Sequence, residues 1–210
     1  MIRVLVADDH AVVRKGLTQI LSDTENIRVV GEAPNAAEAV RLLRQTPCDL
    51  LLMDVAMPGK NGIEALKVIK DEFPQVRVLI LSMYPEDQFG VRALKAGAAG
   101  YLTKDSAPEK LIEAVERIMS GKRYITEGLA ELLAESMSPA SEVPPHQTLS
   151  DREFQTLRLI ASGKKLSEIA STLALSPKTV SVYRTRLLEK MRLTNNAELT
   201  HYAIKNGLVD

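Results

Sequence analysis

The chain has little cysteine and no long apolar run, and both absences limit what it can be. Cys48 is the only cysteine among 210 residues, so no disulfide can form within the chain, and a buried structural thiol is the favoured interpretation. No stretch approaches the roughly 18 to 20 apolar residues of a membrane span. The acidic pair Asp8 and Asp9 stands where a signal peptide would place its apolar segment. These features predict a cytoplasmic protein with no membrane partner.

The chain also lacks net charge, but its charges are unevenly distributed. Residues 1–145 contain 17 Lys and Arg against 21 Asp and Glu, and residues 146–210 contain 10 against 6. The resulting net charges are −4 and +4, and a basic C-terminal segment suggests a polyanion partner for that part. A hydrophobic content of 45% and a charged content of 26% are ordinary for globular protein, and the length suits two domains.

Short apolar runs alternate with amphipathic segments from residue 1 to about residue 122. The runs read as strands at 2–7, 29–33, 50–54, 78–82 and 100–102. Helical spacing occurs between and after them, in segments such as 36–45, 63–72, 87–96 and 108–120. Five strands and five helices in strict alternation predict a parallel, doubly wound α/β sheet of flavodoxin-like type. Ser106 with Glu109 predicts a capping box at the last helix.

The pattern changes beyond Gly121. One more short helix is expected at 128–136, and residues 137–147, with three prolines and no periodicity, have linker composition. Ser150 and Glu153 predict a second capping box, with Leu149 stapled against Phe154.

The remaining residues are helical in pattern. Helices are expected at 151–161, 167–173, 177–191 and 197–206. Ser176 followed by Pro177 is an N-cap with a first-turn proline. A short helix, a tight turn and a longer helix are typical of a helix-turn-helix.

Carboxylates follow the apolar runs of the first part. Asp8 and Asp9 follow the first predicted strand, Asp54 ends the third, and Lys104 follows the fifth. The carboxyl ends of strands in such a sheet converge where ligands bind. Carboxylates this close need a cation, and Mg²⁺ prefers oxygen ligands while leaving positions for phosphate oxygens. A metal beside a carboxylate nucleophile can support formation of an acyl phosphate, and Ser82 offers a hydroxyl to the same place.

These residues resemble the CheY-like receiver domains of two-component response regulators over about 120 residues. The resemblance lies in Asp8-Asp9, Met53-Asp54-Val55-Ala56-Met57-Pro58-Gly59 with Gly62, Ser82, and Tyr101 three residues before Lys104. It implies that Asp54 accepts a phosphoryl group from a sensor histidine kinase. It implies also that Asp9, Asp54 and the Ala56 carbonyl hold Mg²⁺, that Asp8 assists through water, and that Lys104 binds the phosphoryl group.

The same resemblance implies a switch pair, Ser82 and Tyr101, in which the hydroxyl moves toward the phosphate and the ring turns inward. Ala56 and Tyr84 stand where the family faces the water that attacks the phosphoryl group. Alanine cannot orient that water, so a long-lived phosphorylated form is our hypothesis. His10 can be interpreted as a ligand, but a solvated loop histidine is the favoured interpretation.

The segment 177–191 has one apolar face and one mixed face. Val180, Leu187 and Met191 lie on the apolar face, flanked by Leu188 and Tyr183. The opposite face contains Lys178, Ser181, Val182, Thr185, Arg186 and Glu189. Cations beside small side chains suit a helix in a DNA major groove. A solvated surface helix is the alternative, but it leaves the exposed Val182 unexplained.

The last 62 residues resemble the LuxR-type DNA-binding domain of NarL/FixJ response regulators. The resemblance lies in Leu149-Ser150-x-Arg152-Glu153, Ile160-Ala161-x-Gly163, Glu168-Ile169-Ala170, Leu175-Ser176-x-x-Thr179-Val180 and Ala197-Glu198-Leu199 to Gly207-Leu208. It implies that Ser181, Val182 and Thr185 face bases. It implies that the phosphate-facing residues are Lys178, Thr179, Tyr183, Arg184, Arg186 and Lys190, with Arg184 near the core face. The pair Tyr183-Arg184 and the run 198–201 most resemble the GacA/UvrY branch. Lys165-Leu166-Ser167 departs from the family's Ser-Asn-Lys, so the scaffold helix is expected to lose its cap and to begin near Ser167.

Together these features predict a receiver at 1–122, a linker with a short helix at 123–147, and a helix-turn-helix domain at 148–210. The protein is expected to be a non-enzymatic, phosphorylation-gated regulator that binds double-stranded promoter DNA as a homodimer, with 197–206 as the dimer helix. Two alternatives stay open. One is a magnesium-dependent phosphohydrolase with Asp54 as nucleophile, and the other is a DNA-binding regulator whose receiver serves protein interaction without phosphate.

Overall fold

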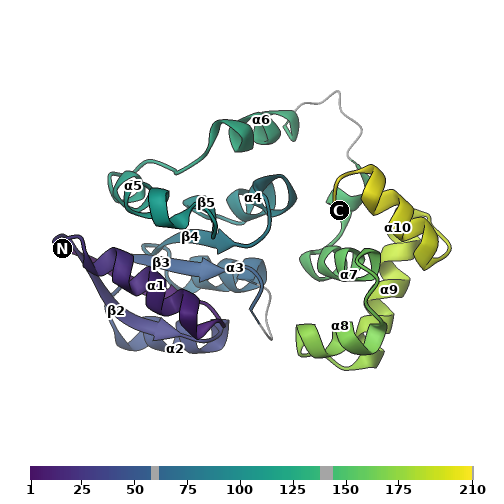
Figure 1. Cartoon of the computed structure of the whole chain (residues 1–210), viewed down its shortest axis with the longest axis horizontal. Coiled ribbons are helices and arrows are strands. Elements are labelled where there is room, and N and C mark those ends of the chain that lie inside the picture. Colours follow the sequence, from purple (N-terminus) through teal and green to yellow (C-terminus); the bar gives the residue numbers. More distant parts are fainter. Residues whose placement is uncertain (58–61, 138–143, 210) are drawn as a thin grey trace. The chain divides into compact units, whose positions relative to one another are not determined.

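The computed structural model of the chain describes residues 1–57, 62–137 and 144–209. It has two compact units, Met1–Ser138 and Pro139–Asp210 (Figure 1). In the part of the chain that is described, no helix has the length and apolar character needed to cross a membrane. The division between the units falls within the segment 123–147 that the sequence assigns to a linker.

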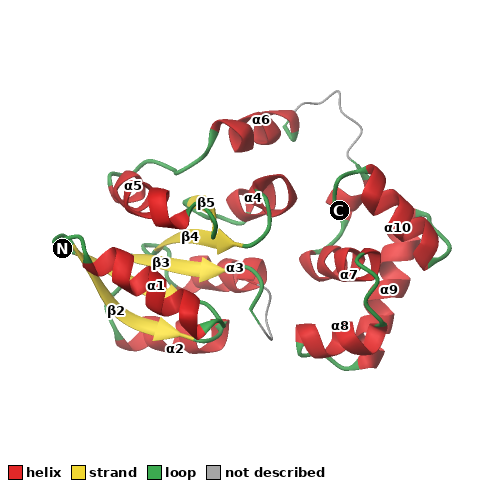
Figure 2. Cartoon of the chain, viewed as in Figure 1, coloured by secondary structure: helices red, strands yellow, loops and turns green. Residues whose placement is uncertain are grey.

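The first unit is built on a five-stranded parallel sheet with the strand order β2-β1-β3-β4-β5 (Figure 2). The strands are β1 (Ile2–Ala7), β2 (Ile27–Ala33), β3 (Leu50–Asp54), β4 (Arg77–Ser82) and β5 (Gly100–Thr103). Ala7 of β1 pairs with Met53 of β3, so these two central strands end level with each other. The order reverses between β1 and β3, and that switch point is where open α/β sheets bind ligands.

Helices cover both faces of this sheet, as the alternating sequence pattern predicts. They are α1 (Ala11–Ser22), α2 (Ala36–Gln45), α3 (Gly62–Glu72), α4 (Glu86–Lys95) and α5 (Ala107–Met119). Helices α1 and α5 pack together on one face, where Leu17 and Leu111 join every second strand residue, such as Val4 and Leu50, in one buried core. The predicted α/β class is confirmed, and the predicted ranges of β1, β3 and α2 match the structure.

The predicted capping box at α5 is wrong. The backbone of Ser106 is helical, with φ −89° and ψ −8°, and its side chain caps nothing. Its hydroxyl lies 2.7 Å from the Thr103 hydroxyl and donates to the Thr103 carbonyl. An N-cap side chain reaches the first helical N–H groups only from an extended backbone. Because the turn from Thr103 already coils, the Ser106 hydroxyl points back along the chain.

The expected short helix forms as α6 (Glu127–Glu135), and it packs on α4. The Thr126 hydroxyl donates to the Glu86 carboxylate at 2.6 Å. Leu129 is fully buried, and its methyl groups lie close to Gly90, where a Cβ would be 2.6 Å from Leu129 Cδ1. Residues 123–137 therefore belong to the first unit instead of forming a free linker.

The described residues of the second unit form helices joined by short turns, and no strand occurs among them. It contains the 3₁₀ turn η1 (Pro145–Thr148) and the helices α7 (Asp151–Ala161), α8 (Leu166–Leu173), α9 (Pro177–Met191) and α10 (Asn196–Lys205). Helix α7 packs against both α9 and α10, and α8 packs against α9. The predicted capping box at α7 is confirmed, because Ser150 Oγ accepts from the Glu153 N–H and the Glu153 carboxylate accepts from the Ser150 N–H.

The two helices of the helix-turn-helix begin differently. At α9 the Ser176 hydroxyl accepts from the Thr179 N–H, so the predicted N-cap is confirmed. At α8 the N-cap is Lys165, whose ammonium group cannot accept a hydrogen bond. The Glu168 carboxylate instead accepts from the Lys165 N–H at 2.7 Å. The expected loss of a side-chain cap is confirmed, and the helix begins at Leu166, one residue before the predicted start.

Candidate functional site

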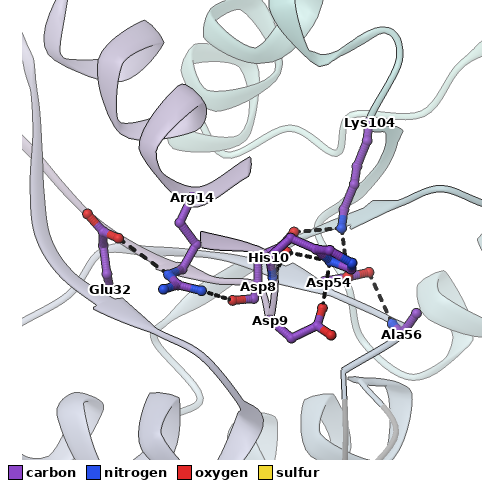
Figure 3. Close-up of polar contacts among 8 residues, drawn as sticks. All are labelled: Asp8, Asp9, His10, Arg14, Glu32, Asp54, Ala56 and Lys104. Atoms are coloured by element: carbon purple, nitrogen blue, oxygen red, sulfur yellow. Dashed lines mark hydrogen bonds and ion pairs between the residues drawn. The ribbon is translucent and has the colours of Figure 1, made fainter. Parts of the chain in front are cut away.

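Carboxylates from two strand ends meet at the switch point of the sheet. Asp8 and Asp9 follow β1, Asp54 ends β3, and all three point toward one place (Figure 3). Asp8 and Asp54 are each 1% exposed, whereas the Asp9 side chain is 25% exposed. The structure thus brings together the three acidic residues that the sequence proposes as a metal site.

Lys104 joins this acidic group from the turn after β5. Its Nζ is 2.6 Å from Asp8 Oδ2 and 2.7 Å from Asp54 Oδ2, and only 7% of its side chain is exposed. Burial acts to lower the pKa of Lys104, but the two carboxylates outweigh it and raise that pKa. Lys104 therefore stays charged, and it links the ends of β1, β3 and β5 through one ammonium group.

One ammonium does not balance the acidic charge. Burial raises the pKa of Asp54 even though Lys104 and the Ala56 N–H, 3.0 Å from Oδ1, favour its ionised form. Asp8 Oδ2 and Asp9 Oδ1 are buried oxygens, and each contacts one nitrogen: Lys104 Nζ lies 2.6 Å from Asp8 Oδ2, and His10 Nδ1 lies 2.9 Å from Asp9 Oδ1. Because Asp8 and Asp54 share the single Lys104 ammonium, a second cation would stabilise ionised Asp54 and offset the remaining acidic charge. The donor set is carboxylate oxygen, which suits Mg²⁺.

His10 is mostly exposed, which agrees with the solvated histidine favoured from the sequence, but its ring also contacts the acidic group. Its side chain is 65% exposed, as expected for a loop residue. Its Nδ1, however, lies 2.9 Å from Asp9 Oδ1 and 3.4 Å from Asp8 Oδ1 (Figure 3). The imidazole therefore contacts the acidic group, and its role as a ligand, which the sequence left as the alternative, stays a prediction.

Arg14 is a second residue that the sequence did not reveal. Its Nη1 donates to the Asp8 carbonyl at 2.7 Å, and its Nε donates to the Glu32 carboxylate on β2 at 3.3 Å (Figure 3). The side chain is only 15% exposed. Arg14 thus fixes the backbone between β1 and α1, where both aspartates start. The sequence feature that could have indicated this role is the position of Arg14, about one helical turn after the acidic pair.

The predicted switch residues both contact Tyr84. Ser82, which is fully buried, accepts from the Tyr84 N–H at 3.0 Å, and the Tyr101 hydroxyl donates to the Tyr84 carbonyl at 2.8 Å. The Tyr101 ring is fully buried, and the Tyr84 ring packs on Phe89 of α4 with centroids 5.1 Å apart. A change at Ser82 can therefore reach α4 through one residue. Whether the pair switches stays a prediction.

Gly62 explains how α3 starts so close to Asp54. Its N–H donates to the Val55 carbonyl, and a Cβ at this position would be 2.4 Å from the Asp54 carbonyl oxygen. Any side chain there would push α3 away from the end of β3. Pro58 and Gly59, which also contribute to the family resemblance, lie outside the described residues.

Cys48 lies away from this site. Its thiol donates to the Leu50 carbonyl at 3.1 Å, and burial raises its pKa to about 11. We therefore expect alkylation by iodoacetamide at pH 8 to be about 100-fold slower in the folded chain than in urea, because only the thiolate reacts. Mass spectrometry of quenched samples measures both rates. Equal rates would contradict the assignment of Cys48 as a structural thiol.

In the second unit, α9 presents the two faces that the helical wheel predicts. Val180, Leu187, Leu188 and Met191 are buried, and Val182 is 43% exposed. The remaining predicted DNA-facing residues are exposed or half-buried: Lys178, Thr179, Ser181, Tyr183, Arg184, Thr185, Arg186 and Lys190. The Thr185 hydroxyl donates to the Ser181 carbonyl within the helix.

Two of these residues have contacts inside the unit. Arg184 Nε donates to Asn196 Oδ1 at the start of α10, at 2.6 Å. Lys190 Nζ lies 2.7 Å from Glu153 Oε2, and that carboxylate is only 4% exposed. Lys190 therefore neutralises the carboxylate that caps α7. Its charge is already compensated within the domain, unlike a lysine held free for a phosphate.

We accordingly expect Lys190→Ala to destabilise the second unit, by about 1–3 kcal/mol, because it leaves a buried carboxylate without its cation. Its effect on the salt dependence of DNA binding should be small. Lys178→Ala is the matched comparison, and it should reduce the salt slope by about 1 without loss of stability. Urea denaturation and DNA titrations at several salt concentrations distinguish the two. If Lys190→Ala changed the slope as much as Lys178→Ala, the compensation by Glu153 would be wrong.

Each of the two units matches a known protein family. Residues 4–116 match the response regulator receiver domain, and residues 147–203 match the luxR family of bacterial regulatory proteins. The chain belongs to the response regulators in which a receiver precedes a LuxR-type DNA-binding domain.

Its curated relatives include the response regulator GacA of Pseudomonas aeruginosa, which is 41% identical over 211 aligned residues. The alignment covers 100% of this chain and 99% of GacA. The response regulator UvrY of Escherichia coli is 41% identical over 209 residues, and the alignment covers 99% of this chain and 96% of UvrY. The resemblance to the GacA/UvrY branch is confirmed.

Solved structures of RcsB, several of them from Salmonella, are similar over both units. RcsB bound to promoter rprA in the presence of the phosphomimetic BeF₃⁻ has 29% identity, a TM-score of 0.67, and coverage of 96% of this chain and 98% of its own. A structure of two RcsB dimers on two parallel DNAs has 30% identity, a TM-score of 0.60 and 96% coverage of each chain.

Proposed function

We propose that this response regulator couples phosphorylation of Asp54 to binding of promoter DNA. A sensor histidine kinase donates the phosphoryl group to Asp54 in the cytoplasm, and the phosphorylated chain binds double-stranded DNA as a homodimer through α9. The observation that carries the proposal is the Asp54 carboxylate, whose oxygens accept from Lys104 and from the Ala56 N–H beside two further aspartates. We assign no enzymatic turnover beyond this transfer and slow self-dephosphorylation.

The acidic group would hold Mg²⁺ through Asp9, Asp54 and the Ala56 carbonyl, with Asp8 assisting through water. When bound, the ion supplies positive charge that offsets the negative charge of the incoming phosphoryl group. Lys104 would bind a phosphoryl oxygen, since its Nζ already lies 2.7 Å from Asp54 Oδ2. Asp8 and Asp54 are each 1% exposed and share one ammonium group, and this excess of buried acidic charge supports the assignment over a purely structural acidic turn.

A phosphoryl group adds about −1.5 to −2 charge beside Ser82. If the Ser82 hydroxyl moves to that group, it releases the Tyr84 N–H, which it accepts at 3.0 Å in this structure. Tyr84 packs on Phe89, and α4 packs on α6, the helix before the second unit. This series of contacts supports a receiver surface with two states that phosphorylation biases. The buried Tyr101 donates a hydrogen bond to the Tyr84 carbonyl in this structure and would stabilise Tyr84 in its present position.

In the DNA-bound form we assign base contacts to Ser181, Val182 and Thr185 and phosphate contacts to the neighbouring cations, with α10 as the dimer helix. Support comes from the exposure of this face and from the similarity to RcsB dimers solved on DNA. Paired half-sites related by two-fold symmetry are therefore expected.

Sequencing of genomic DNA retained by the purified protein tests this function. With acetyl phosphate and Mg²⁺ present, the retained fragments should share one motif repeated with two-fold symmetry. The Asp54→Asn chain treated identically should retain little of it. If both chains retain the same DNA to the same extent, the receiver acts without phosphate, and the gating proposal is wrong.

The phosphorylated form should persist because Ala56 has no polar side chain to orient an attacking water. We expect an Ala56→Asn chain to lose its phosphoryl group faster than the wild type. Decay within seconds in the wild-type chain, measured after removal of acetyl phosphate, would contradict this assignment.

A further inference from the structure

His10 supplies the acidic group with a nitrogen donor. Although most of its ring surface is exposed, its Nδ1 turns inward and lies 2.9 Å from Asp9 Oδ1 (Figure 3). One donor atom from each of Asp8, Asp9, His10 and Asp54 lies within 4.8 Å of the others. The local donor set is therefore three carboxylates and one imidazole, which differs from the all-oxygen set described above.

The backbone holds the imidazole in this position. His10 is the N-cap residue of α1, with an extended backbone at φ −87° and ψ 109°. Its N–H donates to Asp8 Oδ1 at 2.8 Å, and its carbonyl accepts from the Arg14 N–H at 3.1 Å. Arg14 in turn donates to the Asp8 carbonyl. Because both sides of the residue are fixed, the ring reaches Asp9 without rearrangement of the turn.

The spacing of the two donor atoms suits one shared ion. Neighbouring ligands in an octahedral site with bonds of about 2.1 Å lie about 3.0 Å apart. The Asp9 Oδ1 to His10 Nδ1 distance of 2.9 Å is close to that value. Asp9 Oδ1 is buried and contacts His10 Nδ1, so a cation bound between these two atoms would take the place of that contact.

We propose that His10 is a ligand of the receiver's metal site and gives that site a preference for borderline divalent ions such as Co²⁺ over Mg²⁺. Imidazole nitrogen binds later transition metals more strongly than it binds Mg²⁺, which selects oxygen. This inference rests on the proposed metal site at Asp9 and Asp54 and adds the class of ion that the site favours. The opposing explanation is that His10 is only a cation that pairs with Asp9 and competes with any metal.

Titration of the tag-free full chain with Co²⁺ and with Mg²⁺, followed by calorimetry, distinguishes these explanations. In the His10→Ala chain the Co²⁺ affinity should fall by about 10- to 100-fold. Its Mg²⁺ affinity should change by less than about threefold, since oxygen ligands remain. The visible absorption of bound Co²⁺ should also change. His201→Ala, which removes an exposed histidine of α10, is the matched control and should leave both affinities unchanged.

Four results would overturn the proposal. Equal Co²⁺ affinities in the wild type and His10→Ala would show that His10 binds no metal. A rise in both affinities in His10→Ala would identify His10 as a competing cation. If the wild type bound neither ion, or if Asp9→Asn bound Mg²⁺ as tightly as the wild type, the metal site itself would fail, and the proposed function with it.

Discussion

Replacing Asp54 by asparagine is expected to abolish uptake of a phosphoryl group from acetyl phosphate. The amide of asparagine carries no negative charge and is a poor nucleophile, whereas the Asp54 carboxylate is positioned by Lys104 and by the Ala56 N–H. The same substitution should remove the phosphate-dependent gain in DNA affinity. An allosteric coupling of ordinary size predicts a gain of about 5- to 150-fold in the wild type. Electrophoresis in a phosphate-binding gel, with DNA titration on the same samples, measures both effects.

Asp71→Asn is the matched control, because Asp71 is an exposed aspartate on α3, the helix that follows β3. It should accept phosphate and bind DNA as the wild type does. If Asp54→Asn took up phosphoryl groups at the wild-type level, another residue would be the acceptor. Uptake lost in both variants would point to general damage to the first unit.

The second large effect is on stability. Lys104→Met should lower the free energy of unfolding of the first unit by about 3–5 kcal/mol at pH 7, because it leaves Asp8 and Asp54 buried without their shared cation. The loss should shrink as the pH falls. Burial already raises the pKa of Asp54, so the folded state binds a proton more tightly than the unfolded state and gains stability on acidification.

Urea denaturation followed by far-ultraviolet circular dichroism measures this effect, with Lys110→Met as the matched control on the exposed surface of α5. Added Mg²⁺ should restore part of the lost stability, since a ligand that binds only the folded chain stabilises it. A loss no larger than that of Lys110→Met would mean that the carboxylates tolerate burial without Lys104.

The main features of the fold were predictable from the sequence because they depend on local patterns. Continuous apolar runs identified β1 and β3 with their correct bounds, and the aspartates at their ends identified the switch point. The Ser150 and Ser176 caps were also predicted correctly, since each precedes an extended-to-helical change that local residues determine. The Ser106 cap failed because a turn from β5 was already coiled before it.

The details of the site were less predictable, because they depend on contacts between distant segments. The DNA contact of Lys190 stays a prediction, but its pairing with Glu153, 37 residues away, could not be read from the sequence. Arg14 reaches Glu32 on a neighbouring strand, which only the sheet order reveals. The contact of His10 with Asp9 depends on the direction of the His10 side chain, and the sequence does not determine that direction. In each case the missing information was how the residue is placed in the folded chain relative to its contact partner.

The central claim is that chemistry at Asp54 controls DNA binding by a separate domain. The most direct measurement is the DNA affinity of the full wild-type chain at constant salt, determined alongside the fraction of chains phosphorylated at Asp54. We predict that affinity rises in proportion to that fraction, and that it stays at its starting value when EDTA is present throughout. An affinity that stays constant while Asp54 becomes fully phosphorylated would contradict the account.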